Sequence, residues 1–250
     1  MIVCTGIEKH FPGGRGVVSC DFAAADGEVT YLVGPNGSGK TTLLRMIAGS
    51  LRPDAGTVTV NGLNLRWRAD AKRHLGVNLD AFAVDRSLTA WTHILWQARA
   101  AGLGTADARA ALDRVGLYEV RGKRLTTFSY GMLQRVGLAS ALLGDPRTVV
   151  LDEPLNGLDA EGIIWMRELL AEETARGTCF LVASHIFGEV EATASRVIVL
   201  GGGQILFDGP VAELLALGEG PRRFESAYTA LTSEFVSYSG KGRWPGVGTA

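Results

Sequence analysis

One short segment constrains this chain more than any other. Residues 34–41, GPNGSGKT, fit the pattern G-x-x-x-x-G-K-[ST] at every fixed position. An apolar, β-rich run at 29–33 precedes the segment, and a run with helical spacing at 42–48 follows it and ends before Gly49. A strand, a glycine-rich turn and a helix start direct backbone N–H groups toward phosphate oxygens. The segment therefore predicts a binding site for a nucleoside triphosphate.

Each residue type in this segment has a chemical reason. Glycine lets the backbone curl around an anion because it has no Cβ. Lys40 is expected to place its positive charge against the β- and γ-phosphates, and Thr41 to offer its hydroxyl to Mg²⁺. The expected nucleotide-binding residues of the loop are Gly34, Pro35, Asn36, Gly37, Ser38, Gly39, Lys40, Thr41 and Thr42.

Composition bounds the class of protein. A chain of 250 residues with 46% hydrophobic residues is long enough for one large domain, or for a core with a subdomain. The net charge of −1 gives no field that favours nucleic acid, so no nucleic-acid partner is expected. No apolar run approaches the roughly 20 residues that span a bilayer, and the first residues do not resemble a signal peptide. These features predict a soluble, cytoplasmic protein, for which any membrane role must come through partners. Three cysteines without a C-x-x-C spacing predict buried free thiols.

The pattern along the chain predicts an α/β fold. Compact apolar runs at 148–151, 179–183 and 197–200 are typical of buried parallel strands with helices between them. Shorter runs at 2–8 and 57–60 predict a flanking antiparallel sheet, and 201–207 predicts a terminal hairpin. A helical region rich in Ala, Leu and Arg, about 88–141, predicts an inserted helical subdomain, followed after Pro210 by helices at 211–216 and 227–236. The end of the chain, from 239, is expected to be mobile.

Two acidic residues end one of the predicted strands. Asp152 and Glu153 follow the run at 148–151, and ligands bind at the carboxyl ends of strands in parallel sheets. Asp152 is expected to hold Mg²⁺ directly or through water, and Glu153 to polarise the attacking water. His185 follows the next strand and is expected at the γ-phosphate. The catalytic candidates are therefore Glu153, His185 and Lys40. A solvated acidic turn and a structural histidine are the alternatives.

Taken together, these residues resemble the ATP-binding-cassette (ABC) ATPases, over about Ile2 to Leu215. The run at 34–42 matches the Walker A loop, and 149–153 matches the Walker B strand. SYGMLQR at 129–135 matches the family signature, usually written LSGGQxQR, although Ser129 alone would be read as an ordinary helix cap. The run at 155–159 matches the D-loop, His185 the switch histidine, and Phe11 the aromatic residue that stacks on adenine.

The resemblance implies a fold and a mechanism. The fold is a P-loop NTPase core with a mostly parallel sheet and flanking helices, an antiparallel β subdomain and an inserted helical subdomain at about 81–141. The ATPase domain would span 1–220, and a C-terminal extension 221–250. Two cassettes would pack head to tail, each ATP being closed over by Ser129 and Gly131 of the other subunit, with Asp159 communicating across the interface. Both half-sites look intact, which permits a homodimer.

Details of the motifs favour one branch of the family. The runs at 131–135, 142–146, 156–159 and 209–215 are similar to the bacterial ABC-2 type exporter ATPases, including the antibiotic- and lantibiotic-resistance types. Such a subunit would lie peripherally on the inner face of the cell membrane, under transmembrane permease subunits that export a drug, antibiotic, lantibiotic or polymer. The alternatives are a non-transport ABC ATPase of translation or DNA repair, and a scaffold that binds ATP without hydrolysing it.

Four positions need separate interpretation. Asp80 stands where the family places a Gln that contacts Mg²⁺ and the membrane subunit, and we expect it to reach the nucleotide and Mg²⁺ only through water or by a loop movement. Tyr130 stands where Gly is frequent, and we expect no loss of activity from it. Leu155 stands where Thr or Ser is common, and we expect its effect to be small. Trp91 is predicted either to line the groove for a membrane subunit or to pack in the helical subdomain.

Overall fold

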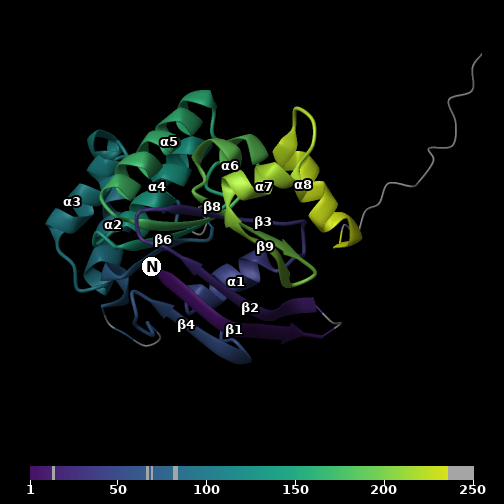
Figure 1. Ribbon diagram of the computed structural model, residues 1–250. Coiled ribbons are helices and arrows are strands. Elements are labelled where there is room, and N and C mark those ends of the chain that lie inside the picture. The colour runs from purple at the N-terminus through teal and green to yellow at the C-terminus, as the bar shows by residue number, and fades with distance from the viewer. Residues whose placement is uncertain (13–14, 66–67, 69, 81–83, 236–250) are drawn as a thin grey trace, which may run out of the picture.

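Two sheets organise the fold (Figure 1). The structure is a computed structural model that describes residues 1–12, 15–65, 68, 70–80 and 84–235. The larger sheet has six strands in the order β5-β6-β7-β3-β8-β9, and all neighbours pair in parallel except β8 and β9. Its strands are β3 (Val29–Val33), β5 (Leu75–Asn78), β6 (Thr148–Asp152), β7 (Cys179–Ala183), β8 (Arg196–Gly201) and β9 (Gln204–Pro210).

The larger sheet is buried on both faces. Along each central strand, alternate side chains enter two different hydrophobic clusters, as the two-residue period of a strand requires. Tyr31 and Phe180 belong to the cluster on the side of the large helices, whereas Leu32 and Leu181 face the other cluster, and each is at most 1% exposed. Burial on both faces explains why these strands are continuous apolar runs in the sequence.

The second sheet is antiparallel and lies against one face of the first. It has the order β2-β1-β4, formed by β1 (Ile2–Phe11), β2 (Arg15–Ala24) and β4 (Ala55–Val60). Helix α1 (Lys40–Ile47) lies between the two sheets (Figure 1). Its residues Leu43, Leu44, Met46 and Ile47 are all buried in the cluster that both sheets share. The N-terminus of α1 is thereby fixed beside the end of β3.

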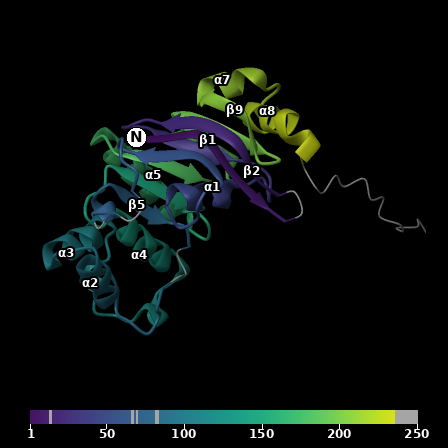
Figure 2. The ribbon, with the colours of Figure 1, turned by 90° about the horizontal axis from the view of Figure 1, so that it is seen from below.

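The remaining helices cover the opposite face of the larger sheet. Helices α2 (Ala90–Ala100), α3 (Thr105–Arg114) and α4 (Tyr130–Leu142) gather at one end of the molecule, and α7 and α8 lie at the other (Figure 2). The other α-helices are α5 (Ala160–Ala175), α6 (Phe187–Thr193), α7 (Val211–Leu217) and α8 (Arg223–Thr232). Single 3-10 turns occur at Ala71–Arg73, Tyr118–Val120, Leu125–Thr127 and Ser233–Phe235.

The predicted fold class is confirmed, with corrections to single elements. The three predicted parallel strands are β6, β7 and β8, and the predicted hairpin is β8–β9. Strand β2 was not predicted, and α8 begins four residues earlier than the helix predicted at 227–236. Trp91 is partly buried and packs edge-on against the Tyr118 ring at 6.3 Å between centroids, which favours the packing interpretation. The subdomain boundary at 81–141 stays a prediction, since 81–83 lie outside the described residues, as does the tail from 236.

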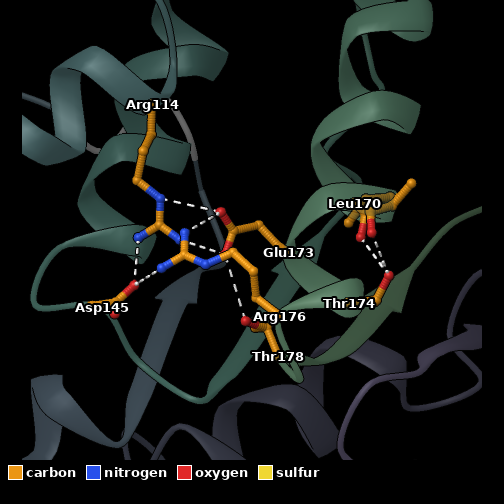
Figure 3. Close-up of polar contacts among 8 residues, drawn as sticks. Arg114, Asp145, Leu170, Glu173, Thr174, Arg176 and Thr178 are labelled. Atoms are coloured by element: carbon orange, nitrogen blue, oxygen red, sulfur yellow. Dashed lines mark hydrogen bonds and ion pairs between the residues drawn. The ribbon is translucent and has the colours of Figure 1, made fainter.

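A charge network joins α3 to the end of α5 (Figure 3). The Glu173 side chain on α5 is only 4% exposed. It accepts both Nε (3.1 Å) and Nη2 of Arg114, and Arg176 Nη1 at 3.2 Å. Asp145, in the turn after α4, accepts a second bond from Arg114 at 2.8 Å. The network therefore ties the helices at one end of the molecule to the sheet-covering helix α5.

We predict that Arg114→Ala destabilises the protein by roughly 3 kcal/mol, because it leaves a buried carboxylate short of its main partner. Thermal or urea unfolding followed by circular dichroism measures this loss. Arg68→Ala is the matched control, since Arg68 pairs with Asp70 while both side chains are over 40% exposed, and we expect little change there. Equal losses in the two variants would contradict a special role for the buried network.

Candidate functional site

The candidate site lies where four parallel strands end at the same edge of the sheet. The phosphate-loop segment 34–41 follows β3, Asp152 ends β6, and His185 lies two residues beyond β7. Asp80 lies two residues beyond β5. Because these strands are parallel neighbours, residues that are far apart in sequence meet at one edge.

These segments surround a cleft of about 560 Å³. The cleft combines most of the predicted nucleotide-binding residues with Phe11, Asp80 and the two strand-end carboxylates. Its lining residues are Phe11, Gly16, Asn36, Gly37, Gly39, Lys40, Thr41, Thr42, Leu79, Asp80, Tyr130, Gln134, Asp152, Glu153 and Asn156. Of the other predicted site residues, Gly34, Pro35 and Ser38 shape the loop, His185 contacts Glu153, and Ser129, Gly131 and Asp159 lie outside the lining.

The loop backbone leaves no room for a side chain at Gly34 and constrains the backbone conformation at Gly39. A Cβ on Gly34 would lie 2.3 Å from the carbonyl oxygen of Leu200 and 2.6 Å from Ser38 Oγ. Gly39 has φ +106°, a conformation that only glycine adopts readily. Ser38 Oγ is buried and has no hydrogen-bond partner within the described residues. Backbone N–H groups in a glycine cradle are an arrangement that an anionic oxygen would complete.

Lys40 lies inside this loop rather than extending into solvent. Its Nζ donates to the carbonyl oxygens of Gly34 at 2.6 Å and Pro35 at 3.3 Å. Burial lowers the pKa of the Lys40 ammonium, and the nearby carboxylates of Glu153 and Asp152 offset only part of that shift. The ammonium is therefore held at the loop by two backbone carbonyl oxygens.

Thr41 and Asp152 meet across the cleft. Thr41 Oγ1 donates to Asp152 Oδ2 at 3.0 Å, which joins the start of α1 to the end of β6. Burial raises the pKa of Asp152, although the Thr41 hydrogen bond opposes that rise. A hydroxyl and a carboxylate at this distance are two oxygen ligands of the kind that a hard divalent cation takes in proteins.

Glu153 and His185 form the second polar pair of the site. His185 Nδ1 and Glu153 Oε2 are 2.8 Å apart, with side-chain exposures of 63% and 26%. The Glu153 backbone has φ +51°, which is uncommon for a residue with a side chain. Its N–H donates to the carbonyl oxygen of Ala183 at 3.0 Å, the last residue of β7. The chain thus holds the carboxylate in a strained backbone position, as is frequent at functional sites.

Two of the predicted interface residues cap helices. Ser129 Oγ accepts from the N–H of Met132 at 3.2 Å at the start of α4. Asp159 Oδ1 accepts from the N–H of Gly162 at 2.8 Å at the start of α5. Both residues are exposed, and Gly131 is partly exposed beside them. Capping accounts for their local structure, and their contact with a partner's nucleotide stays a prediction.

Five cleft residues, Gly16, Leu79, Tyr130, Gln134 and Asn156, were not assigned by sequence reasoning, and the last three belong to the signature and D-loop motifs. Tyr130, Gln134 and Asn156 line the cleft with the phosphate loop. Gln134 is 5% exposed, and its Nε2 donates to the carbonyl oxygen of Asn156 at 3.1 Å. Their positions in the signature and D-loop motifs were the available signal, but a linear motif does not show which of its side chains face the cleft of their own subunit.

Comparison with known proteins places the chain in a family. Residues 18–156 match the model of the ABC transporter family. Among curated proteins, the chain is 37% identical to an uncharacterized ABC transporter ATP-binding protein of Synechocystis, over 79% of the chain and 57% of the relative. It is 32% identical to the ABC transporter ATP-binding protein NatA of Bacillus subtilis, over 86% of the chain and 91% of the relative. It is also 32% identical to the daunorubicin/doxorubicin resistance ATP-binding protein DrrA of Streptomyces peucetius, over 85% and 66%.

The lengths of the relatives differ from that of the chain. The chain spans 57% and 60% of the two cyanobacterial relatives that it matches. Among solved structures, the ATP-binding subunit of an ABC transporter superposes with a TM-score of 0.81 at 24% identity, over 92% of this chain and 99% of the other. A dimeric ATP-binding cassette in a post-hydrolysis state, with ADP and Pi, gives 0.75 at 21% identity, over 84% and 99%. With the ABC ATPase fold seen in these structures and the family match over more than half its length, the chain belongs to the ABC transporter family.

Proposed function

We propose that the chain binds ATP in the 560 Å³ cleft and hydrolyses it to drive a membrane transporter. The observation that carries this proposal is the meeting of two polar pairs at one sheet edge. Thr41 and Asp152 would bind the cation, and Glu153 and His185 would contact the attacking water. Lys40 supplies the positive charge between them.

The nucleotide is bound mainly through its phosphates. Backbone N–H groups of the loop and the start of α1 face the anion, and Lys40 exchanges its carbonyl partners for phosphate oxygens. Phe11, 39% exposed at the end of β1 and part of the cleft lining, stacks on the adenine ring. In this arrangement the aromatic ring contacts the adenine, and the loop binds the charged triphosphate.

Mg²⁺ fits the oxygen pair of Thr41 and Asp152. The described residues contain no group of three or more His, Cys, Asp or Glu that could hold a metal. A site with one carboxylate and one hydroxyl suits Mg²⁺, which keeps waters and takes phosphate oxygens as its other ligands. Asp80, exposed and in the same cleft lining, is placed to contact the ion through water. Once bound, the ion neutralises charge that develops on the phosphate oxygens.

Glu153 is the proposed general base. Its carboxylate accepts the proton of the attacking water, while the hydrogen bond to His185 fixes the carboxylate and leaves the imidazole beside the γ-phosphate position. The backbone anchor to Ala183 keeps the group at the end of β6. This division of roles needs both side chains on one edge of the sheet, which the parallel order of β6 and β7 provides.

The working unit that we propose is a dimer with transmembrane permease subunits. Ser129, Gly131 and Asp159 are exposed or partly exposed and lie outside the cleft lining, as residues that close over a partner's ATP would. The names of two relatives, a daunorubicin/doxorubicin resistance protein and a Nod factor export protein, support an exporter at the inner face of the membrane. Within the part of the chain that is described, no helix is long and apolar enough to cross a bilayer. Identifying what co-purifies with the chain distinguishes this function from the alternatives. A co-purifying permease would support transport. Co-purifying ribosomes or DNA would support a non-transport ATPase.

We predict that Glu153→Gln lowers kcat for ATP hydrolysis by at least about 10²-fold, because the amide cannot accept the proton. ATP binding should survive, since the substitution keeps the shape of the side chain. Steady-state phosphate release and binding of a fluorescent ATP analogue measure the two quantities. Glu168→Gln, an exposed carboxylate on α5, is the matched control and should leave both unchanged. Wild-type rates in Glu153→Gln would rule out Glu153 as the base.

We predict that ATP converts the Glu153→Gln variant into a dimer on size-exclusion chromatography with light scattering, because blocked hydrolysis keeps the interface closed. Adding Ser129→Asp should abolish this dimer. Asp caps a helix as well as Ser does, so α4 keeps its start, but the carboxylate would face the partner's γ-phosphate. A dimer that persists in the double variant would show that Ser129 does not meet the nucleotide of a partner.

We predict that Asp80→Ala raises the Mg²⁺ concentration for half-maximal ATPase activity by about 10-fold, the usual effect of losing a group that orients metal-bound water. A Mg²⁺ titration at saturating ATP measures it. Asp113→Asn, an exposed acid on α3 remote from the cleft, controls for the lost charge. An unchanged titration would assign Asp80 to the loop surface alone.

A further inference from the structure

The Tyr130 ring packs on the turn that follows Glu153. A Cβ built on Gly157 would lie 2.2 Å from Cε1 and 2.4 Å from Cδ1 of Tyr130, so the ring lies directly on the glycine backbone. Gly157 also has φ +71°, which favours glycine. The first turn of α4 and the turn at 155–159 are therefore fitted to each other, with an aromatic ring on one side and a bare backbone on the other.

The same turn is bonded to Glu153. The N–H of Asn156 donates to the carbonyl oxygen of Glu153 at 3.2 Å, and Gln134 Nε2 donates to the carbonyl oxygen of Asn156 at 3.1 Å. Glu153 itself has φ +51°, so its backbone depends on these neighbours to hold an uncommon conformation. A displacement of the turn therefore changes where the Glu153 carboxylate points.

Tyr130 also borders the cleft directly. It lines the cavity together with Glu153, Asn156 and Gln134, although its side chain remains 42% exposed. An aromatic side chain that is this exposed contributes little to the stability of the core, compared with buried aromatics such as Phe180. Its removal should therefore affect the geometry of the turn more than the folding of the protein.

We propose that Tyr130 is a positioning residue for ATP hydrolysis. Its ring supports the 155–159 turn at Gly157, and the turn holds Glu153 against His185. This inference rests on the proposed ATPase function. Tyr130 would therefore act within its own subunit by supporting this turn. Ser129 and Gly131 of the same motif would instead contact a partner's nucleotide.

The test makes the side chain at Tyr130 smaller and the one at Gly157 larger, singly and together. Tyr130→Ala removes the support and should lower kcat by about tenfold or more, because small misplacements of a catalytic group cost up to about 10²-fold. KM for ATP and the melting temperature should change little. Gly157→Ala should also lower kcat, since its Cβ displaces the ring. The double variant should lose less than the product of the two single defects, because the clash has gone with the ring and only the backbone strain at φ +71° remains.

Gly102→Ala is the matched control for backbone strain. Gly102 has φ +68°, and a Cβ there would meet nothing within 4 Å, so any loss of melting temperature should come without a loss of kcat. Wild-type kcat in Tyr130→Ala, or defects that multiply in the double variant, would overturn the proposal. If Glu153→Gln abolishes ATP hydrolysis but Tyr130→Ala does not change it, the proposed ATPase function stands and only the positioning role of Tyr130 is overturned.

Discussion

The parallel pairing of β7 with both β3 and β6 is the constraint on which the site depends. Ala183, the last residue of β7, is in register with Leu32 on one side and Asp152 on the other. The phosphate loop and the acidic strand end thus leave the sheet at one level with a single strand between them, about 10 Å apart at the usual strand spacing. Thr41, at the start of α1, closes this gap through its 3.0 Å bond to Asp152. The residues of the site are brought together by the register of the parallel strands, although they are far apart in the sequence.

The electrostatics of the cleft are incomplete without a ligand. Burial lowers the pKa of Lys40 and raises that of Asp152, so both groups are in surroundings that disfavour their charged forms. Carbonyl oxygens are weak substitutes for phosphate around Lys40, and one hydroxyl proton is a weak substitute for a cation beside Asp152. The proposed ligand, a triphosphate with Mg²⁺, would supply a negative charge beside Lys40 and a positive charge beside Asp152.

Local motifs in the sequence were sufficient to predict part of this site, because their geometry is set within a few residues. The glycine loop at 34–41 and the Ser129 helix cap are of that kind. The contacts of Tyr130 with Gly157 and of Arg114 with Glu173 are not, because they join helices and turns whose packing no single segment encodes. Strand β2 was not predicted, for a related reason. It lies at the edge of the small sheet, so several of its side chains are exposed and its apolar pattern is weak.

Helix α5 connects these long-range contacts. Near its start, the turn at 155–159 receives Tyr130 and Gln134 from α4. At its middle, the Arg135 guanidinium lies 3.8 Å from the centroid of the Trp165 ring, and near its end Glu173 binds Arg114 of α3. The helices α3 and α4 are therefore attached to α5 and its preceding turn at three places, which are the turn at 155–159, Trp165 and Glu173. Because α4 also packs on β5 and β6, a movement of α4 relative to the sheet would reach Glu153 through β6 as well as through that turn, so the position of α4 and the geometry of Glu153 are linked.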